Sequence, residues 1–261
     1  GLYYLSAARL AEILDMPVGS VRAWIGNGLL LLTNKGERVA YLPAAAVLLR
    51  ASSRPGTTSS LLAVAPSRGG LRHAPEEVRA VDAPFRPNAR TLIGSEATEG
   101  RFKRIAADFR VLHLATHGYF NEANPLMSGL ELEPDGNDDG MLRVHEILDL
   151  PLHADLVTLS ACDTALGSGY FAELPVGDEF VGLNRAFLAA GSAAVMATLW
   201  QVDDRASVSL MKQFYGRLRA AGAARDAASA LASAQRAQRG SRELAHPYYW
   251  AAYVVVGQIN S

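Results

Sequence analysis

From residue 61 onward, short apolar runs alternate with longer segments in which apolar residues recur every three or four positions. Short runs bounded by polar or glycine residues are typical of buried strands, whereas the longer periodicity is typical of amphipathic helices. Residues 129–133 alternate in polarity, which indicates an edge strand or one arm of a hairpin. We expect strands at 61–65, 91–93, 110–115, 156–160, 193–200 and 251–256, and helices at 75–81, 97–106, 144–148, 178–190, 203–220 and 224–239.

The order of these elements predicts the fold class. Strands that alternate with helices of this length form a mostly parallel sheet, because each helix carries the chain back across one face of the sheet to the start of the next strand. We therefore expect residues 61–261 to form one α/β domain, in which helices sandwich a mostly parallel sheet. Reactive groups should lie at the carboxyl ends of the strands, where open α/β sheets form their binding crevice.

Residues 1–50 have a different pattern and are predicted to form a small separate unit. Two short helical segments are followed by two apolar runs that flank a polar turn, which is the pattern of a hairpin. The expected helices cover 6–14, capped by Ser6, and 18–25, introduced by Pro17, and the expected hairpin strands cover 29–32 and 39–42. A polar stretch at 51–60 links this unit to the rest of the chain.

Cys162 is the only cysteine of the chain and closely follows the expected strand at 156–160. His117 follows the expected strand at 110–115 in the same way, 45 residues earlier. Both residues should therefore open onto one edge of the sheet. A nearby imidazole lowers the pKa of a thiol and makes the nucleophilic thiolate available, so this pair predicts the chemistry of a cysteine nucleophile.

The neighbouring residues suggest roles within such a site. His117 would act as the general base, or as the acid that protonates the leaving amine. Gly118 has no side chain, so its N–H can approach a substrate closely and could form an oxyanion hole with the N–H of Cys162. Cys162 also has an ordinary interpretation, because a lone cysteine often packs as a small hydrophobe. His113, on the same expected strand, is predicted to be either a core histidine or one that supports the catalytic residues from behind.

Composition narrows the classes of function. A chain of 261 residues that is 49% hydrophobic can bury one large core or two smaller ones. Its net charge of −1 gives no global attraction to nucleic acid or to a membrane surface. No apolar stretch approaches the roughly 18 residues of a membrane span. One cysteine and six scattered histidines show no spacing of zinc ligands, so we expect no metal and no other cofactor.

The same composition suggests a compartment. A single cysteine cannot form an internal disulfide, and the first residues do not combine a basic segment with an apolar one as a secretory signal does. We therefore expect a cytoplasmic protein. The chain begins at Gly1 rather than Met, which suggests a piece of a longer protein.

Seven ordered segments, spread over about residues 39–257, resemble the CHAT domain, a caspase-like family in the clan of caspases and separase. The most specific of them contain Ala-Thr-His-Gly ending at Gly118 and Ser-Ala-Cys ending at Cys162. A histidine about 50 residues before the cysteine is also the caspase spacing. The seven segments cover 41–48, 112–120, 140–150, 159–164, 177–183, 198–204 and 246–253.

This resemblance implies a caspase-like cysteine endopeptidase that cleaves a protein substrate without a cofactor. His117 and Cys162 would be its catalytic dyad, with Gly118 beside the oxyanion. The resemblance also implies a bacterial protein that is held inactive until a partner or a flanking repeat domain signals. The alternative from another class is a signalling or scaffold module that uses the same fold to bind proteins.

The resemblance also suggests where specificity arises. In related proteins, the residue two before the cysteine lines the pocket for the side chain that precedes the cleaved bond. Here that residue is Ser160, which predicts an uncharged, aliphatic preference. Asp163, Asp203 or Asp204 could instead reach the pocket and favour Arg or Lys, although all three also suit capping positions. Residues 165–175 are predicted to form either a gate that orders on activation or an ordinary surface loop.

A third candidate function rests on residues 6–28, which resemble a helix-turn-helix of the MerR or excisionase type. Its second helix, 18–25, would enter the major groove of DNA. Basic residues are sparse here, and phosphate contacts dominate nucleic-acid affinity, so the composition argues against a nucleic-acid partner. A structural or regulatory helix pair is the favoured interpretation. The basic residues of the N-terminal unit are Arg9, Arg22, Lys35 and Arg38.

Overall fold

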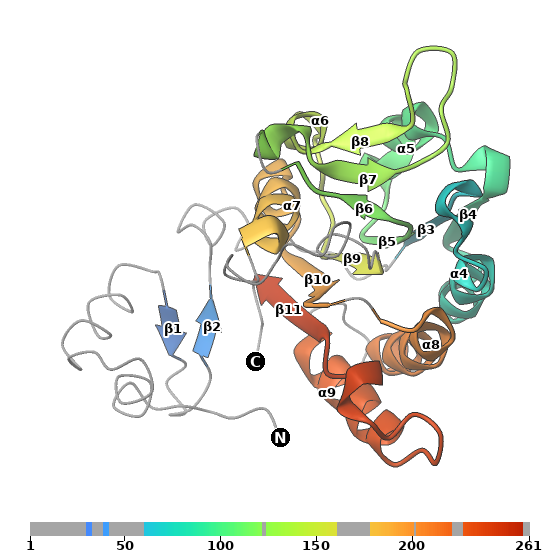
Figure 1. Ribbon diagram of the computed structural model, residues 1–261, viewed down its shortest axis with the longest axis vertical. Helices are drawn as coiled ribbons and strands as arrows, with labels where there is room; N and C mark the ends of the chain where they lie inside the picture. The colour runs from blue at the N-terminus through green and yellow to red at the C-terminus, as the bar shows by residue number, and fades with distance from the viewer. Residues whose placement is uncertain are drawn as a thin grey trace.

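A six-stranded sheet with strand order β11-β10-β9-β5-β3-β4 forms the centre of the fold (Figure 1). The computed structural model describes residues 30–32, 39–41, 60–121, 124–160, 178–200, 202–220 and 227–257. The strands are β3 (Leu61–Ala65), β4 (Ala89–Ile93), β5 (Val111–Ala115), β9 (Leu156–Ser160), β10 (Ala194–Thr198) and β11 (Tyr253–Gly257). Five of these strands run parallel, whereas β11 runs antiparallel to β10. The expected mostly parallel sheet is therefore confirmed.

Helices cover both faces of this sheet (Figure 1). On one face lie α4 (Ala74–Asp82), α8 (Asp204–Ala220) and α9 (Ala227–Arg239). On the other lie α5 (Glu99–Ile105), α6 (Val144–Leu148) and α7 (Asp178–Ala190). Short 3-10 helices cover Arg68–Gly70, Ala83–Phe85, Gly94–Glu96, Ala106–Asp108, Pro125–Met127 and Pro247–Tyr249. This arrangement confirms the predicted α/β sandwich.

The central strands are apolar on both faces because both faces are covered. On β3, Leu61 and Ala63 pack into the core under α4, α8 and α9, whereas Leu62 and Val64 pack into the core under α5 and α7. All four side chains are fully buried. Full burial of one leucine contributes roughly 1.5–3 kcal/mol, so these runs account for much of the stability of the sheet. They also explain why the strands lack an alternating pattern.

An ion pair joins β5 to β9 at the amino ends of the two strands. Arg110, just before β5, donates from Nε to Asp155 Oδ2 at 2.9 Å and from Nη2 to Oδ1 at 2.5 Å. Asp155 lies just before β9, so the bidentate pair links the starting points of two neighbouring strands. Both side chains are largely buried, which strengthens the contact.

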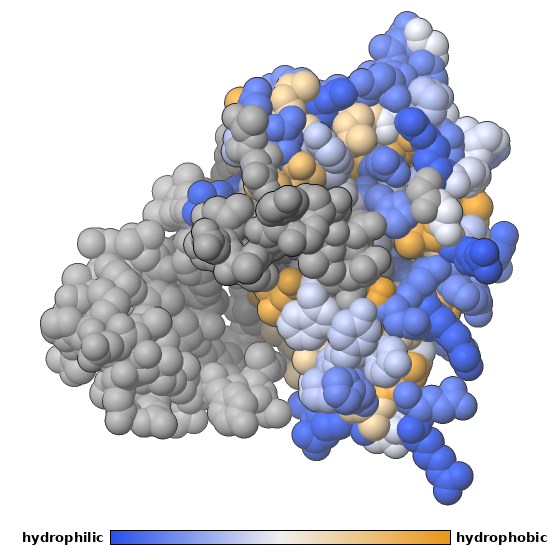
Figure 2. Space-filling view, in the orientation of Figure 1, coloured by the Kyte–Doolittle hydropathy of each residue, from blue (hydrophilic) through white to orange (hydrophobic). Residues whose placement is uncertain are grey.

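A second, three-stranded antiparallel sheet follows β5 in the chain. It consists of β6 (Gly118–Tyr119), β7 (Gly129–Glu131) and β8 (Met141–Arg143), in that order. Gly129 is required by the close approach of β8, because an added Cβ would lie 2.6 Å from the carbonyl oxygen of Leu142. Figure 2 shows hydrophilic side chains over the loop between β7 and β8, at the top of the molecule. The sequence predicted only the β7 strand of this sheet.

Other predictions meet the structure to different degrees. The expected N-terminal hairpin is confirmed, since β1 (Leu30–Leu32) pairs antiparallel with β2 (Val39–Tyr41). The two expected helices at 6–14 and 18–25 lie outside the described residues, as does the linker at 51–59. The proposed division at about residue 60 therefore stays a prediction. None of the described helices is both long enough and apolar enough to cross a membrane.

Candidate active site

His117 lies where β5 ends and the second sheet begins. Thr116 Oγ1 donates to the carbonyl oxygen of Glu131 on β7, and the Glu131 N–H donates to the carbonyl oxygen of His117 at 2.8 Å. These bonds hold the histidine backbone between the two sheets at the carboxyl edge of the larger one. The His117 residue is half-buried, so part of its surface remains accessible.

Gly118 is buried and pairs with Leu130 across β6 and β7. In an antiparallel ladder, pairs with backbone hydrogen bonds alternate with pairs that have none. The bond from the Glu131 N–H to His117 makes the preceding pair, His117 with Glu131, a bonded one. The Gly118–Leu130 pair is then of the unbonded kind. This alternation directs the Gly118 N–H away from β7.

Cys162 lies outside the described residues, as do Asp163 and the predicted gate at 165–175. The strand before the cysteine is well defined, because β9 ends at Ser160 and its register with β5 pairs Leu114 with Leu159 and Ala115 with Ser160. His117 and Cys162 each stand two residues beyond the Ala115–Ser160 pair in the sequence. The two strands therefore end at paired residues, Ala115 and Ser160.

Ser160 begins a chain of neutral polar groups under the carboxyl edge of the sheet. Its Oγ lies 3.5 Å from Tyr253 Oη, which donates to Ser207 Oγ at 2.9 Å. Ser207 Oγ in turn donates to the carbonyl oxygen of Asp203 at 3.1 Å. The Ser160 residue is only 6% exposed. Ser160 therefore faces the neutral hydroxyl of Tyr253, and the groups that follow along this chain of hydrogen bonds are a hydroxyl and a carbonyl without a formal charge.

The two acidic residues at the start of α8 have structural partners. Asp203 Oδ1 accepts the Ala206 N–H at 2.8 Å, which confirms the helix-capping interpretation of Asp203. Asp204 Oδ2 accepts the backbone N–H of His73 at 2.7 Å. This bond connects α8 to the segment that precedes α4, so the Asp204 carboxylate has a role in the fold besides the predicted one in substrate binding.

Aromatic residues pack beside the same edge of the sheet. Trp200 Nε1 donates to the carbonyl oxygen of Tyr248 at 3.1 Å, and its ring packs against the core beneath α8 and α9. Leu199 and Tyr248 are exposed. Trp200 therefore packs against the core, whereas its neighbours remain accessible beside the strand end.

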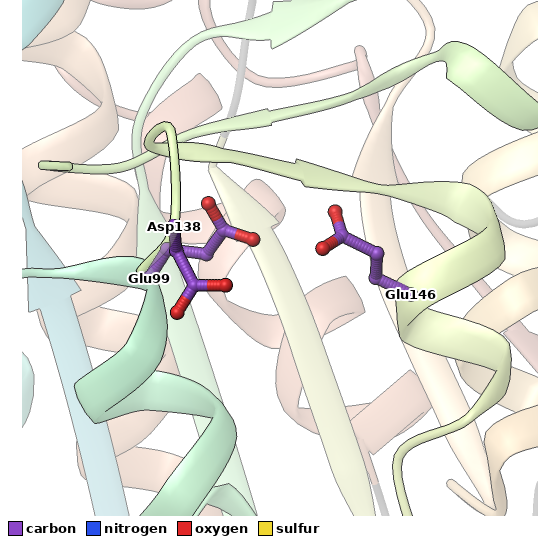
Figure 3. A group of neighbouring side chains, drawn as sticks. All are labelled: Glu99, Asp138 and Glu146. Carbon is purple, nitrogen blue, oxygen red and sulfur yellow. The ribbon is translucent and has the colours of Figure 1, made fainter. Parts of the chain in front are cut away.

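Three carboxylates meet away from this edge, in a group that the sequence did not predict (Figure 3). They belong to Glu99 at the start of α5, Asp138 in the β7–β8 loop and Glu146 in α6. Lys103 Nζ lies 2.8 Å from Asp138 Oδ1 and 2.5 Å from Glu146 Oε1, and it also contacts Glu99. The ammonium therefore joins two helices and a loop. We refer to these four residues as the acidic cluster.

The charges of the acidic cluster shift the pKa values of its members. Burial would lower the pKa of Lys103, but its hydrogen bonds to Asp138, Glu146 and Glu99 raise the pKa well above its ordinary value. Burial raises the pKa of Glu99, and the neighbouring Glu146 adds to the effect. Burial acts the same way on Glu146, but hydrogen bonds from Lys103 and the Arg143 N–H outweigh it and lower that pKa. The two glutamates therefore respond to pH in opposite directions.

The loop before α6 also has the spacing of a calcium-binding loop, Asp-x-Asn-x-Asp-Gly followed after five residues by Glu, over 135–146. Two of these carboxylates are directed to cations of the chain itself. Asp139 forms an ion pair with Arg143 at 2.7 Å, and Glu146 contacts Lys103. This segment therefore ties the second sheet to α5.

Comparison with known proteins decides the family. A family model for the CHAT domain matches residues 20–258. This chain belongs to the CHAT domain family. The match spans most of the described core as well as the N-terminal hairpin, so the resemblance drawn from short motifs is confirmed.

Two curated relatives of this CHAT domain are much longer proteins. Tetratricopeptide repeat protein 28 of Mus musculus is 28% identical over 199 residues, and the Homo sapiens protein of the same name is 28% identical over 200 residues. The matched region covers 64% of this chain in each case but only 8% of the relative. The chain thus spans only a small part of the length of these two relatives.

Solved structures share the fold of this CHAT domain. Saccharomyces cerevisiae separase, in its complex with securin, superposes with a TM-score of 0.55 at 14% identity, covering 84% of this chain and 14% of that one. The gingipain RgpB of Porphyromonas gingivalis, in a complex of its pro- and mature domains, gives a TM-score of 0.54 at 10% identity, covering 82% and 52%. The predicted caspase-like fold is therefore confirmed.

Proposed function

We propose that this CHAT domain is a cysteine endopeptidase that cleaves a protein substrate with His117 and Cys162. The observation that carries the proposal is the β5–β9 register, in which Ala115 pairs with Ser160. His117 and Cys162 each follow this pair by two residues, so both leave the carboxyl ends of adjacent parallel strands, which lie about 4.8 Å apart. A side-chain sulfur and a ring nitrogen are within reach of one another across such a distance.

The chemistry follows from this pair. The thiolate of Cys162 attacks the carbonyl carbon of the cleaved peptide bond, and the resulting oxyanion accepts hydrogen bonds from the N–H groups of Gly118 and Cys162. The imidazolium of His117 then donates its proton to the leaving amine as the C–N bond breaks. Water hydrolyses the remaining thioester and restores the thiol. The direction of the Gly118 N–H, away from β7, supports its assigned role.

We further propose that the substrate pocket accepts an uncharged, aliphatic side chain before the cleaved bond. The neutral Tyr253 hydroxyl, 3.5 Å from Ser160 Oγ, supports this preference. The acids Asp203 and Asp204 are engaged in holding α8 and His73, which weakens the case for a basic side chain. Asp163 remains the candidate that would favour Arg or Lys.

A flanking repeat domain or a separate partner would control the activity. The match to a small part of a tetratricopeptide repeat protein supports this arrangement, since repeats form extended surfaces for binding other proteins. The competing function is a protein-binding module with the same fold and no turnover. Its support is that neither curated relative is named as a protease.

A library of fluorogenic peptides that differ in the residue before the cleaved bond tests the proposed function. The full chain should cleave peptides with an uncharged residue at that position. Cys162→Ala and His117→Ala should each abolish cleavage, because the nucleophile and its base act as a unit. A wild-type protein that binds its partner equally well after Cys162→Ala, and cleaves none of the peptides in either form, would favour the binding module instead.

A further inference from the structure

A chain of buried polar side chains runs from α4 through the centre of the sheet. Glu77 Oε1 of α4 lies 2.9 Å from His113 Nε2 of β5. His113 Nδ1 lies 3.1 Å from Tyr215 Oη of α8, which donates to Thr158 Oγ1 of β9 at 2.7 Å. None of the four residues exposes more than 1% of its surface. The network therefore joins two helices to two adjacent strands where water has no access.

The hydrogen bonds fix where the protons of this network lie. Burial raises the pKa of Tyr215, so its hydroxyl keeps its proton. Tyr215 gives that single proton to Thr158, so it must accept from His113 Nδ1, which is therefore protonated. His113 Nε2 then faces the Glu77 carboxyl group.

Glu77 Oε1 and His113 Nε2 approach to 2.9 Å inside the core, in a contact that is close without being a linear hydrogen bond. Both groups are buried, so replacing only one of them would leave the other without its partner inside the core.

The network lies directly in line with the proposed dyad. His113 and Thr158 are register partners on β5 and β9. His117 follows His113 by four residues, and Cys162 follows Thr158 by four. The buried hydrogen bonds therefore brace β5 and β9 four residues before the two proposed catalytic positions.

We propose that Glu77, His113 and Tyr215 are positioning residues for the His117–Cys162 pair, which rests on the function proposed above. They bind β5 and β9 to α4 and α8, and so fix the separation of the two strand ends. The Arg110–Asp155 ion pair braces the same strands at their opposite ends and offers a matched control. If bracing at any point along β5 and β9 were enough to position the dyad, loss of either contact would have the same effect.

The test reads the Cys162 thiol itself, without a substrate. Cys162 is the only cysteine, so the pH dependence of alkylation by iodoacetamide reports its thiolate alone. Tyr215→Phe and Thr158→Val remove hydroxyls with little change of shape. The double variant Glu77→Leu with His113→Leu removes the pair without leaving a buried charge. Glu77→Gln is the conservative variant, because its amide can donate to His113 Nε2 and keep the network intact.

The wild-type midpoint should lie below the ordinary thiol value of about 8.5. Tyr215→Phe and the double variant should raise it by about half a pH unit or more. They should also reduce kcat for the cleaved peptide roughly 10-fold while KM stays the same. Glu77→Gln should behave as wild type. Asp155→Asn should lower the melting temperature yet leave the midpoint and kcat unchanged.

Two results would overturn the inference in different ways. A depressed wild-type midpoint that Tyr215→Phe and the double variant leave in place would refute the positioning role and spare the dyad. An ordinary wild-type midpoint, equal to that of His117→Ala, would refute the dyad and the positioning role together. Thermal melts of each variant identify any that are not folded. Thr158→Val, which removes the hydroxyl that accepts from Tyr215, replaces such a variant in the test.

Discussion

Arg110 and Asp155 form a bidentate ion pair immediately before β5 and β9, at the edge of the sheet opposite His117. The pair closes the amino ends of the two strands whose carboxyl ends carry the proposed chemistry. The central strands are thus joined at one end by charge and in the middle by the buried network of His113 and Thr158. Changes at the amino ends of these strands should therefore alter stability, whereas changes in the buried network should alter activity.

Replacement of Asp155 tests that separation. Asp155→Asn leaves Arg110 without its charged partner in a largely buried position, and a hydrogen-bonded charge pair of this kind contributes about 2 kcal/mol. We expect the free energy of unfolding to fall by about that amount in urea titrations. Peptide cleavage at a temperature where both proteins are folded should be unchanged. A loss of cleavage by the folded variant would show that the far edge also controls the site.

Removal of the Lys103 side chain from α5 should strongly destabilise the contact between α5, the β7–β8 loop and α6. Lys103→Met leaves the carboxylates of Glu99, Asp138 and Glu146 together without their cation, which typically costs about 3–5 kcal/mol for a buried pair. Urea unfolding measures the loss. The double variant Lys103→Met with Glu146→Gln should recover part of it, because one of the opposed charges is gone. A single variant as stable as wild type would contradict the structural role of the acidic cluster.

The two glutamates of the acidic cluster should respond differently to pH. The pKa of Glu146 is lowered in the folded protein, so its ionised form contributes stability above its ordinary pKa, and this is lost as pH falls through the lowered value. The pKa of Glu99 is raised, so its ionisation opposes folding once pH exceeds its ordinary value. At pH 7, Glu146→Gln should therefore destabilise more than Glu99→Gln. Equal losses at pH 7, measured by urea unfolding, would contradict the opposite shifts.

Ser160 should decide which side chain precedes the cleaved bond. Ser160→Asp places a carboxylate next to the neutral hydroxyl of Tyr253 and should favour a basic side chain. We expect the ratio of kcat/KM for Arg over Leu peptides to rise at least about 10-fold, a change of about 1.4 kcal/mol. Ser160→Ala is the control and should keep the preference for Leu. An unchanged ratio in Ser160→Asp would place the pocket elsewhere.

The sequence predicted the central sheet well for a physical reason. Strands such as 61–65 and 156–160 are buried on both faces, so they appear as continuous apolar runs, and both agree with the observed bounds. The strand at 193–200 was predicted too long, because Leu199 and Trp200 are apolar but lie beyond the end of β10. Apolar character alone does not mark where backbone pairing stops.

The second sheet and the acidic cluster were harder to predict. The β6 strand consists of Gly118 and Tyr119 alone, which is too short to give a periodic pattern. Lys103 and Glu146 lie 43 positions apart, so only the fold brings them together. The local signals were the Glu99–Lys103 spacing of four residues within a helix and the calcium-loop spacing over 135–146. The residues of the proposed active site were predicted from short sequence motifs. The cytoplasmic location and bacterial origin of the protein stay predictions.

The proposed peptidase activity requires His117 and Cys162 to lie close together. The direct measurement is the rate of iodoacetamide alkylation of the full chain across pH 5 to 10, for wild type and His117→Ala. If the two side chains are close, the wild-type midpoint lies at least about one pH unit below the ordinary thiol value near 8.5, and it returns to that value in His117→Ala. Two superimposable curves with ordinary midpoints would contradict it.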